Sequence, residues 1–253
     1  MKYFFTYDEY LPDNVGIELY GGGHICWLIL SLFFCIALCR CYSSLTSDRK
    51  RRLMRIATAS LMLVGEAVRT AALVCSGLYS ISFLPLHLCS LALFFSFYHA
   101  VFGGKILGDF LYSLCLPGAA CALLFPDWTA YPLMNLLSIN AFLNHILLVA
   151  YPLMLVAGKD LKPDFRNLPK CAGIIICIAL PIYFFNKLLD TNYLFLNWPS
   201  PGSPLEIFAN LLGDPAYLLG YIPMLLTVWS CLYIPTLPAS AAFPSLHQDK
   251  KSR

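Results

Sequence analysis

Seven long apolar stretches dominate the sequence and restrict the chain to one class of structure. Each holds roughly 20 residues, the length that an α-helix needs to cross the hydrocarbon core of a bilayer. Apolar residues fill these stretches without the period-two alternation of transmembrane barrel strands. The sequence therefore predicts an all-α, polytopic transmembrane helix bundle with seven spans at about 22–42, 54–76, 81–101, 107–125, 133–157, 170–188 and 211–235.

The lysines and arginines that lie between these stretches are found in alternate connections. They follow the first, third, fifth and last stretches, whereas connections 77–80, 126–132 and 189–210 contain none. Cytoplasmic connections of membrane proteins collect Lys and Arg. The pattern therefore predicts a multi-pass protein of the cell membrane, with its N-terminus outside and its C-terminus cytoplasmic, and this requires an odd number of spans.

The remaining segments are short, so one domain is expected. An extracytoplasmic leader (1–21) is acidic and is followed by no small-residue cleavage site, which distinguishes it from a signal peptide. A single transmembrane domain (22–235) and a cytoplasmic tail (236–253) complete the prediction. The Pro- and Gly-rich connection 189–210 is predicted to be an ordered outer loop or a re-entrant cap.

Composition argues against several function classes. Hydrophobic residues make up 59% of the chain and charged residues 12%, whereas soluble domains hold about 25% charged residues. The net charge of +3 follows the topology pattern and gives no indication of a nucleic-acid partner. The 11 cysteines form no CxxC motif and no Cys/His metal spacing, so no metal and no cofactor are predicted.

Polar residues inside the spans are the candidate functional residues, because they are costly in lipid and tend to face the bundle interior. At 1.5 Å per residue, Cys89 lies about 12 Å and His145 about 18 Å from the outer ends of their spans, and Glu66 and Arg69 lie roughly 10 to 15 Å down. These similar depths predict one site. Its other predicted members are His87, Asn140, Asn144, Asn192 and Tyr193.

A cysteine and a histidine at similar depth suggest a nucleophile and its base. In this interpretation His145 removes the proton of Cys89, and Asn140, Asn144 or Arg69 holds the developing oxyanion. His87 lies two residues from Cys89, which puts it on the far side of a regular helix and makes it the poorer base, although Pro85 can distort that turn.

The same residues also have a purely structural interpretation. Histidine and asparagine form hydrogen bonds between membrane helices, and a buried cysteine is usually inert. Glu66 and Arg69 are three residues apart and can simply pair with each other. The residues alone leave both interpretations open.

Three short segments carry a resemblance to a known family. LPLHLCS (84–90), the Asn144–His145 pair and NYLFL (192–196) are similar to the YwaF-like bacterial integral membrane protein family. That family is related to the animal transmembrane protein 164 acyltransferase family, and the resemblance covers nearly the whole chain. It implies transfer of fatty acyl groups between phospholipids, with Cys89 as nucleophile, His145 as base, and membrane lipids as acyl donor and acceptor.

Three functional hypotheses follow, and the oligomeric state stays open. The first is a lipid-active acyltransferase or hydrolase that uses the Cys/His pair. The second is a small-solute transporter, for which Pro85, Pro117, Pro152, Pro181 and Pro223 would supply kinks in five spans. The third is a ligand-sensing membrane protein without catalysis.

Overall fold

A computed structural model describes residues 2–200 and 203–234. All regular elements in these two ranges are helices, as predicted. Six helices are long and apolar enough to cross a membrane, namely Gly22–Ser44, Asp48–Cys75, Lys105–Leu124, Leu136–Ala157, Phe165–Leu189 and Ala216–Tyr233. The chain divides into two compact units between Asn197 and Trp198, and each is described by itself.

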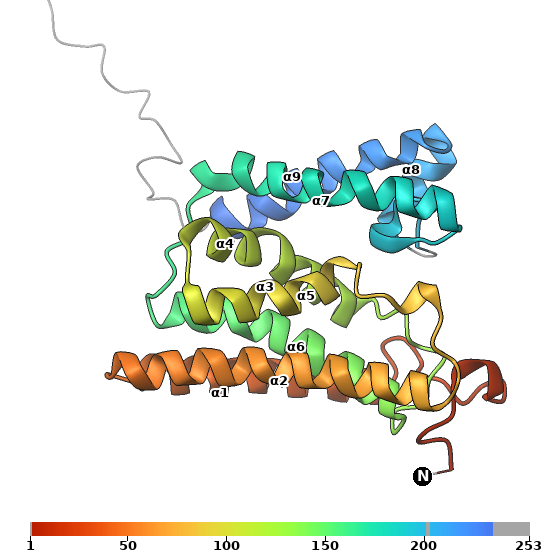
Figure 1. The fold of residues 1–253 in the computed structure, drawn as a ribbon, viewed down its shortest axis with the longest axis horizontal. Helices are drawn as coiled ribbons and strands as arrows, with labels where there is room; N and C mark the ends of the chain where they lie inside the picture. The colour runs from red at the N-terminus through yellow and green to blue at the C-terminus, as the bar shows by residue number, and fades with distance from the viewer. Residues whose placement is uncertain (1, 201–202, 235–253) are drawn as a thin grey trace, which may run out of the picture. The chain divides into compact units, whose positions relative to one another are not determined.

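The first unit is built around one central helix. Its elements are η1 (Asp8–Tyr10), α1 (Gly22–Ser44), α2 (Asp48–Cys75), η2 (Ile81–Phe83), α3 (Leu88–Phe102), α4 (Lys105–Phe110), η3 (Leu111–Cys115), α5 (Leu116–Leu124), α6 (Leu136–Ala157), η4 (Phe165–Asn167), α7 (Leu168–Leu189) and η5 (Tyr193–Phe195). Helix α6 contacts α1, α2, α3 and α5, and Figure 1 shows it between the α1–α2 pair and the α3–α5 pair. Its side chains Phe142, Tyr151 and Met154 are fully buried.

Three connections meet at one end of this unit, here called the basic end. The Arg51 guanidinium donates to the carbonyl oxygens of Leu45 and Gly158, both at 2.7 Å, and pairs with Asp160 at 2.9 Å. The Lys105 ammonium group donates to the carbonyl of Lys162 at 2.7 Å. The connections after α1, α3 and α6 therefore lie together, in agreement with the alternation of Lys and Arg along the sequence.

The third predicted span differs from the sequence-based expectation. Residues 81–101 were predicted to be one helix, but α3 begins only at Leu88 and is a shorter apolar helix that does not count among the six. Pro85 explains the late start, because it disfavours helical backbone in the residue before it, and Leu84 is extended at ψ 144°. His87 is also extended and forms the N-cap of α3.

The fourth span contains a π-helical turn. Helices α4 and α5 continue into one another through η3, a π-helix that covers Leu111–Cys115. Pro117 follows directly, in the first turn of α5. A proline ring collides with the carbonyl four residues earlier in a regular α-helix, and the wider π-turn relieves that crowding.

The leader is tied to the connection between α5 and α6. The Ile17 amide donates to the Thr129 carbonyl at 2.8 Å. The Asn135 side chain donates to the carbonyls of Tyr3 and Thr6, both at 2.8 Å. The leader therefore packs against the unit at the end opposite the basic end.

The second unit contains α8 (Pro204–Leu212), η6 (Ala216–Gly220) and α9 (Tyr221–Tyr233). Helix α8 packs on η6, because a side chain on Gly220 would lie 2.5 Å from the ring of Phe208. The span predicted from residue 211 begins instead at Ala216, because Gly213 has φ +73° and ends α8. The predicted cytoplasmic tail, 236–253, lies outside the described residues.

Candidate functional site

Cys89 is the second residue of α3, in its first turn, and His87 is the N-cap residue of that helix. The depth predicted for Cys89 stays a prediction, but its premise, a helix from residue 81, was wrong, because α3 begins at Leu88. The placement of His87 on the far side of that helix was wrong for the same reason. Leu91 makes the first backbone hydrogen bond of α3, to the His87 carbonyl at 2.9 Å.

The start of α3 offers a suitable environment for acyl chemistry. The first N–H groups of a helix have no backbone partner within the helix, and here they belong to Leu88, Cys89 and Ser90, of which the Cys89 amide donates to its own thiol. Free N–H groups and the helix dipole favour an anion, whether a thiolate or the oxyanion of an acyl intermediate. Because an apolar environment disfavours charge, ionisation of the thiol still requires a base.

Asp127 is a charged residue near the three candidate side chains. It lies in the connection between α5 and α6, is exposed, and interacts electrostatically with His87, Cys89 and His145. Asp127 was not predicted from the sequence, because one carboxylate in an outer connection is typical of a solvated loop. The signal that was present is that Asp127 is the one charged residue of connection 126–132.

His145 is held in one orientation. Its Nδ1 atom lies 2.8 Å from the carbonyl oxygen of Ala141, and its ring stacks on Trp128 with 4.9 Å between ring centroids. A carbonyl only accepts hydrogen bonds, so Nδ1 carries the proton and Nε2 keeps its lone pair. His145 therefore has a basic nitrogen, although within the described part of the chain no hydrogen bond joins it to Cys89.

His87 is packed against aromatic side chains of η5. Its ring lies 5.1 Å from that of Tyr193 and 5.6 Å from that of Phe195. The Tyr193 hydroxyl donates to the carbonyl of Ile81. Burial raises the pKa of Tyr193, so its phenol stays protonated and remains a donor.

The loop that carries Tyr193 is ordered by two asparagines. Asn186 accepts from the amide of Tyr193 at 2.9 Å and donates to its carbonyl at 2.8 Å. Asn192 accepts from the amide of Asn197 at 3.0 Å. Tyr193 therefore reaches the candidate site by its contact with His87. Asn192 instead stabilises the loop.

Glu66 and Arg69 pair as their spacing predicted. Arg69 donates to both carboxylate oxygens of Glu66, at 2.6 and 3.2 Å, and to the Phe83 carbonyl at 3.3 Å. It also interacts electrostatically with His87. The pair therefore lies beside the candidate site, and its two charged groups bind each other.

Asn140 and Asn144 lie at the contact between α6 and α2. A side chain on Gly65 would lie 2.5 Å from Asn144 Oδ1 and 3.0 Å from Asn140 Oδ1. The Nδ2 atom of Asn140 is buried and has no hydrogen-bond partner among the described residues. Both amides thus face α2, and the free N–H groups of α3 are better candidates for the oxyanion.

Two thiols lie near Cys89. They are Cys115, which is buried, and Cys121, which is exposed. Residues 2–200 and 203–234 contain no group of three or more His, Cys, Asp or Glu suited to a metal ion.

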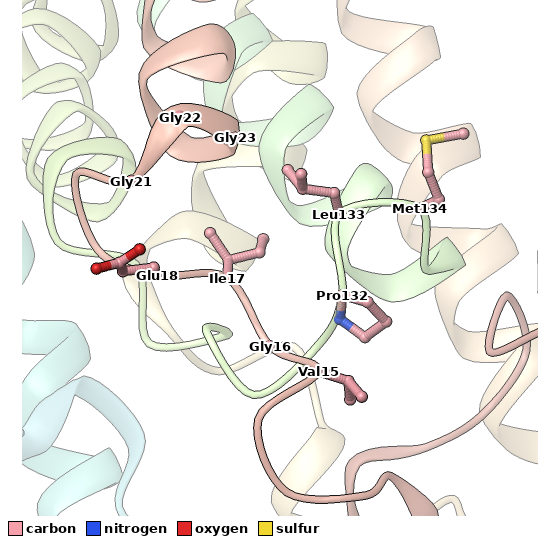
Figure 2. Close-up of a pocket in the computed structure, with 10 residues that line it drawn as sticks. All are labelled: Val15, Gly16, Ile17, Glu18, Gly21, Gly22, Gly23, Pro132, Leu133 and Met134. Carbon is pink, nitrogen blue, oxygen red and sulfur yellow. The ribbon is translucent and has the colours of Figure 1, made fainter.

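A pocket of about 410 Å³ lies elsewhere, between the leader, the start of α1 and residues 132–134. Figure 2 shows its lining, in which Glu18 is the one ionisable side chain. A second pocket, of about 350 Å³, lies between the leader, the end of α2 and the start of α6. Neither is lined by Cys89 or His145, so these pockets are separate from the candidate site.

Comparison with known proteins gives one match. A family model described as TMEM164 family matches residues 19–233. No curated protein and no solved structure matches the chain.

Proposed function

Because the chain belongs to the TMEM164 family, we propose that it is a thiol-dependent acyltransferase or hydrolase that acts on membrane phospholipids. The family match and the apolar helices make it a multi-pass membrane protein. The position of Cys89 in the first turn of α3, together with a His145 ring held by Ala141 and Trp128, is the observation that carries the enzymatic proposal. The kinship with the YwaF-like bacterial family stays a prediction.

In the first step Cys89 accepts an acyl group. Its Sγ atom attacks the carbonyl carbon of a phospholipid ester, and the thiol proton passes to Nε2 of His145. N–H groups at the start of α3 stabilise the oxyanion. The ester C–O bond then breaks, the lysophospholipid leaves with the proton from the imidazolium, and a thioester remains on Cys89.

In the second step the thioester is consumed. A lysophospholipid hydroxyl in the transferase, or water in the hydrolase, attacks the thioester carbonyl while His145 takes its proton. The C–S bond breaks, and the proton returns to Sγ of Cys89. A nearby carboxylate such as Asp127 stabilises the imidazolium of His145 in both steps but disfavours a free thiolate on Cys89, so the thiol proton passes to His145 as Sγ attacks. No oxidant, metal or cofactor is needed.

The proposal includes seven spans, with α3 as the third. At 1.5 Å per residue a 15-residue helix is about 22 Å long, shorter than the hydrocarbon core of about 30 Å. The extended residues 84–87 would cover the remaining depth. Non-helical backbone at such depth is tolerated where protein covers it, and the packing of Tyr193 and Phe195 on His87 supports this.

The charge pattern then sets the orientation that we propose. The basic end faces the cytoplasm and the leader lies outside, so the candidate site opens toward the outer half of the bilayer. Residues 22–235 form one transmembrane domain in the cell membrane.

The test combines a transfer assay with thiol labelling. The full chain is reconstituted in liposomes that contain a phospholipid with an isotope-labelled acyl chain and an unlabelled lysophospholipid. We expect labelled acceptor lipid, or free fatty acid for a hydrolase, with Cys89 and neither with Cys89→Ser. Cys121→Ser is the matched control and should keep the activity, because that thiol lies nearby on α5 but not at a helix start.

Labelling reports on the base independently of the substrate chosen. An alkylating lipid probe should modify Cys89 faster than Cys115 or Cys121, and His145→Ala should abolish this preference in folded protein. His87→Ala should weaken it less. If Cys89 reacts no faster than the other two cysteines, the residues return to the packing interpretation, and the transporter and sensor hypotheses become the better ones.

A further inference from the structure

The cations between residues 40 and 55 fall into two groups. Arg51 and Arg55 face inward and pair with Asp160 at 2.9 and 3.2 Å. The others are exposed, and the described residues provide no carboxylate partner for any of them. They are Arg40, Arg49, Lys50 and Arg52.

This leaves an excess of positive charge at the start of α2. Residues 40–55 contain six cations and a single carboxylate, Asp48. Asp160 is the further carboxylate that reaches this segment, and it is occupied by Arg51 and Arg55. The exposed cations are therefore not neutralised by the unit itself.

An apolar stripe continues from these cations along α2. At 100° per residue Lys50, Leu53, Ala57, Leu61 and Val64 fall within about 80° of one another on the helix. Leu53 is 67% exposed, and Leu61 and Val64 are each 55% exposed. Lys50 stands at the start of the stripe, and Arg49 lies about 40° beyond one of its edges, so this outward face carries cations first and an apolar surface next. Arg52 lies about 60° further round the helix on the same side.

We propose that this face binds an anionic phospholipid. The headgroup phosphate lies against Arg49 and Lys50, Arg52 adds positive charge on the side of Arg49, and an acyl chain lies along the stripe from Leu53 to Val64. Basic residues at a membrane surface attract anionic lipids at about 1 kcal/mol each, or roughly fivefold per cation. A second copy of the chain is a poorer occupant, because a two-fold contact through this face would oppose cation to cation. The site lies at the basic end and does not depend on the proposed acyl chemistry.

Lipid selection by the purified full chain tests this proposal. Native mass spectrometry in detergent would measure retention of phosphatidylglycerol and phosphatidylcholine with identical acyl chains, supplied in equal amounts at low salt. We expect preferential retention of phosphatidylglycerol. Arg49→Gln/Lys50→Gln/Arg52→Gln should reduce this preference by about 100-fold if the three cations act additively, while Arg51 and Arg55 keep their structural pairs.

A matched variant distinguishes a lipid site on α2 from a general attraction of anionic lipids to the basic end. Lys159→Gln/Arg166→Gln/Lys170→Gln removes the same number of charges from the connection after α6 and the first turn of α7, and it should retain the preference. Equal retention of the two lipids by the wild type, or an equal loss in both triple variants, would overturn the proposal. Displacement of the lipid by an equal concentration of glycerol phosphate would overturn the role of the stripe.

Discussion

Gly65 lets α2 approach the two asparagines of α6, and this contact can be tested by adding one methyl group. In Gly65→Ala the new Cβ would lie 2.5 Å from Asn144 Oδ1 and 3.0 Å from Asn140 Oδ1. Overpacking of a tight contact costs about 1–3 kcal/mol, and the better helix propensity of alanine offsets up to about 1 kcal/mol. The expected net loss of roughly 1–2 kcal/mol corresponds to a Tm lower by about 2–8 °C.

Gly173→Ala is the matched control. Gly173 is exposed within α7, and no atom lies within 4 Å of the position that its Cβ would occupy. There the same substitution should leave Tm unchanged or raise it. Adding Asn144→Ala to Gly65→Ala should return part of the lost Tm, measured against Asn144→Ala alone, because the clashing amide is gone. Equal shifts for the two glycine variants would refute the close approach of α2 to α6.

Three further predictions concern the pair, the loop and the topology. Arg69→Ala should destabilise by about 3 kcal/mol, because it leaves the buried Glu66 carboxylate without its partner; Glu66→Gln/Arg69→Gln should recover part of the loss in a thermal-shift assay, and additive losses would contradict the pairing. Asp127→Asn should slow labelling of Cys89 by about tenfold at unchanged Tm, and an unchanged rate would remove Asp127 from the site. A C-terminal reporter that is active only in the cytoplasm should give a signal, whereas one that requires export should not.

Charge and hydropathy predicted the helices and their common end because both act over whole segments. The alternation of Lys and Arg placed the connections after α1, α3 and α6 together, and the contacts of Arg51 and Lys105 agree. Periodicity could not locate the start of α3, because residues 81–87 are as apolar as the helix that follows. Pro85 was the local signal for the late start of the helix. The packing of η5 on His87 is a tertiary contact, which the sequence pattern does not show.

The candidate site was predictable in part. Cys89, His87 and His145 were chosen as polar groups at membrane depth, and their membership of one site stays a prediction, although each has an electrostatic interaction with one charged neighbour. That neighbour, Asp127, lies on a connection, where a carboxylate has no unusual cost. The asparagines were assigned to the oxyanion because a sequence does not tell which helix an amide faces, and the small residue opposite them lies on another span.

The leader bears on how this protein is handled in the laboratory. It is hydrogen-bonded to the connection that carries Asp127 and Trp128. The Ile17 amide donates to the Thr129 carbonyl, and the Asn135 side chain donates to two leader carbonyls. Trimming the leader for expression, or crowding it with a bulky fusion partner, would free that connection and with it the support of His145. Purification tags therefore belong at the C-terminal end, and preparations clipped by proteases near the N-terminus should be discarded before any activity is measured.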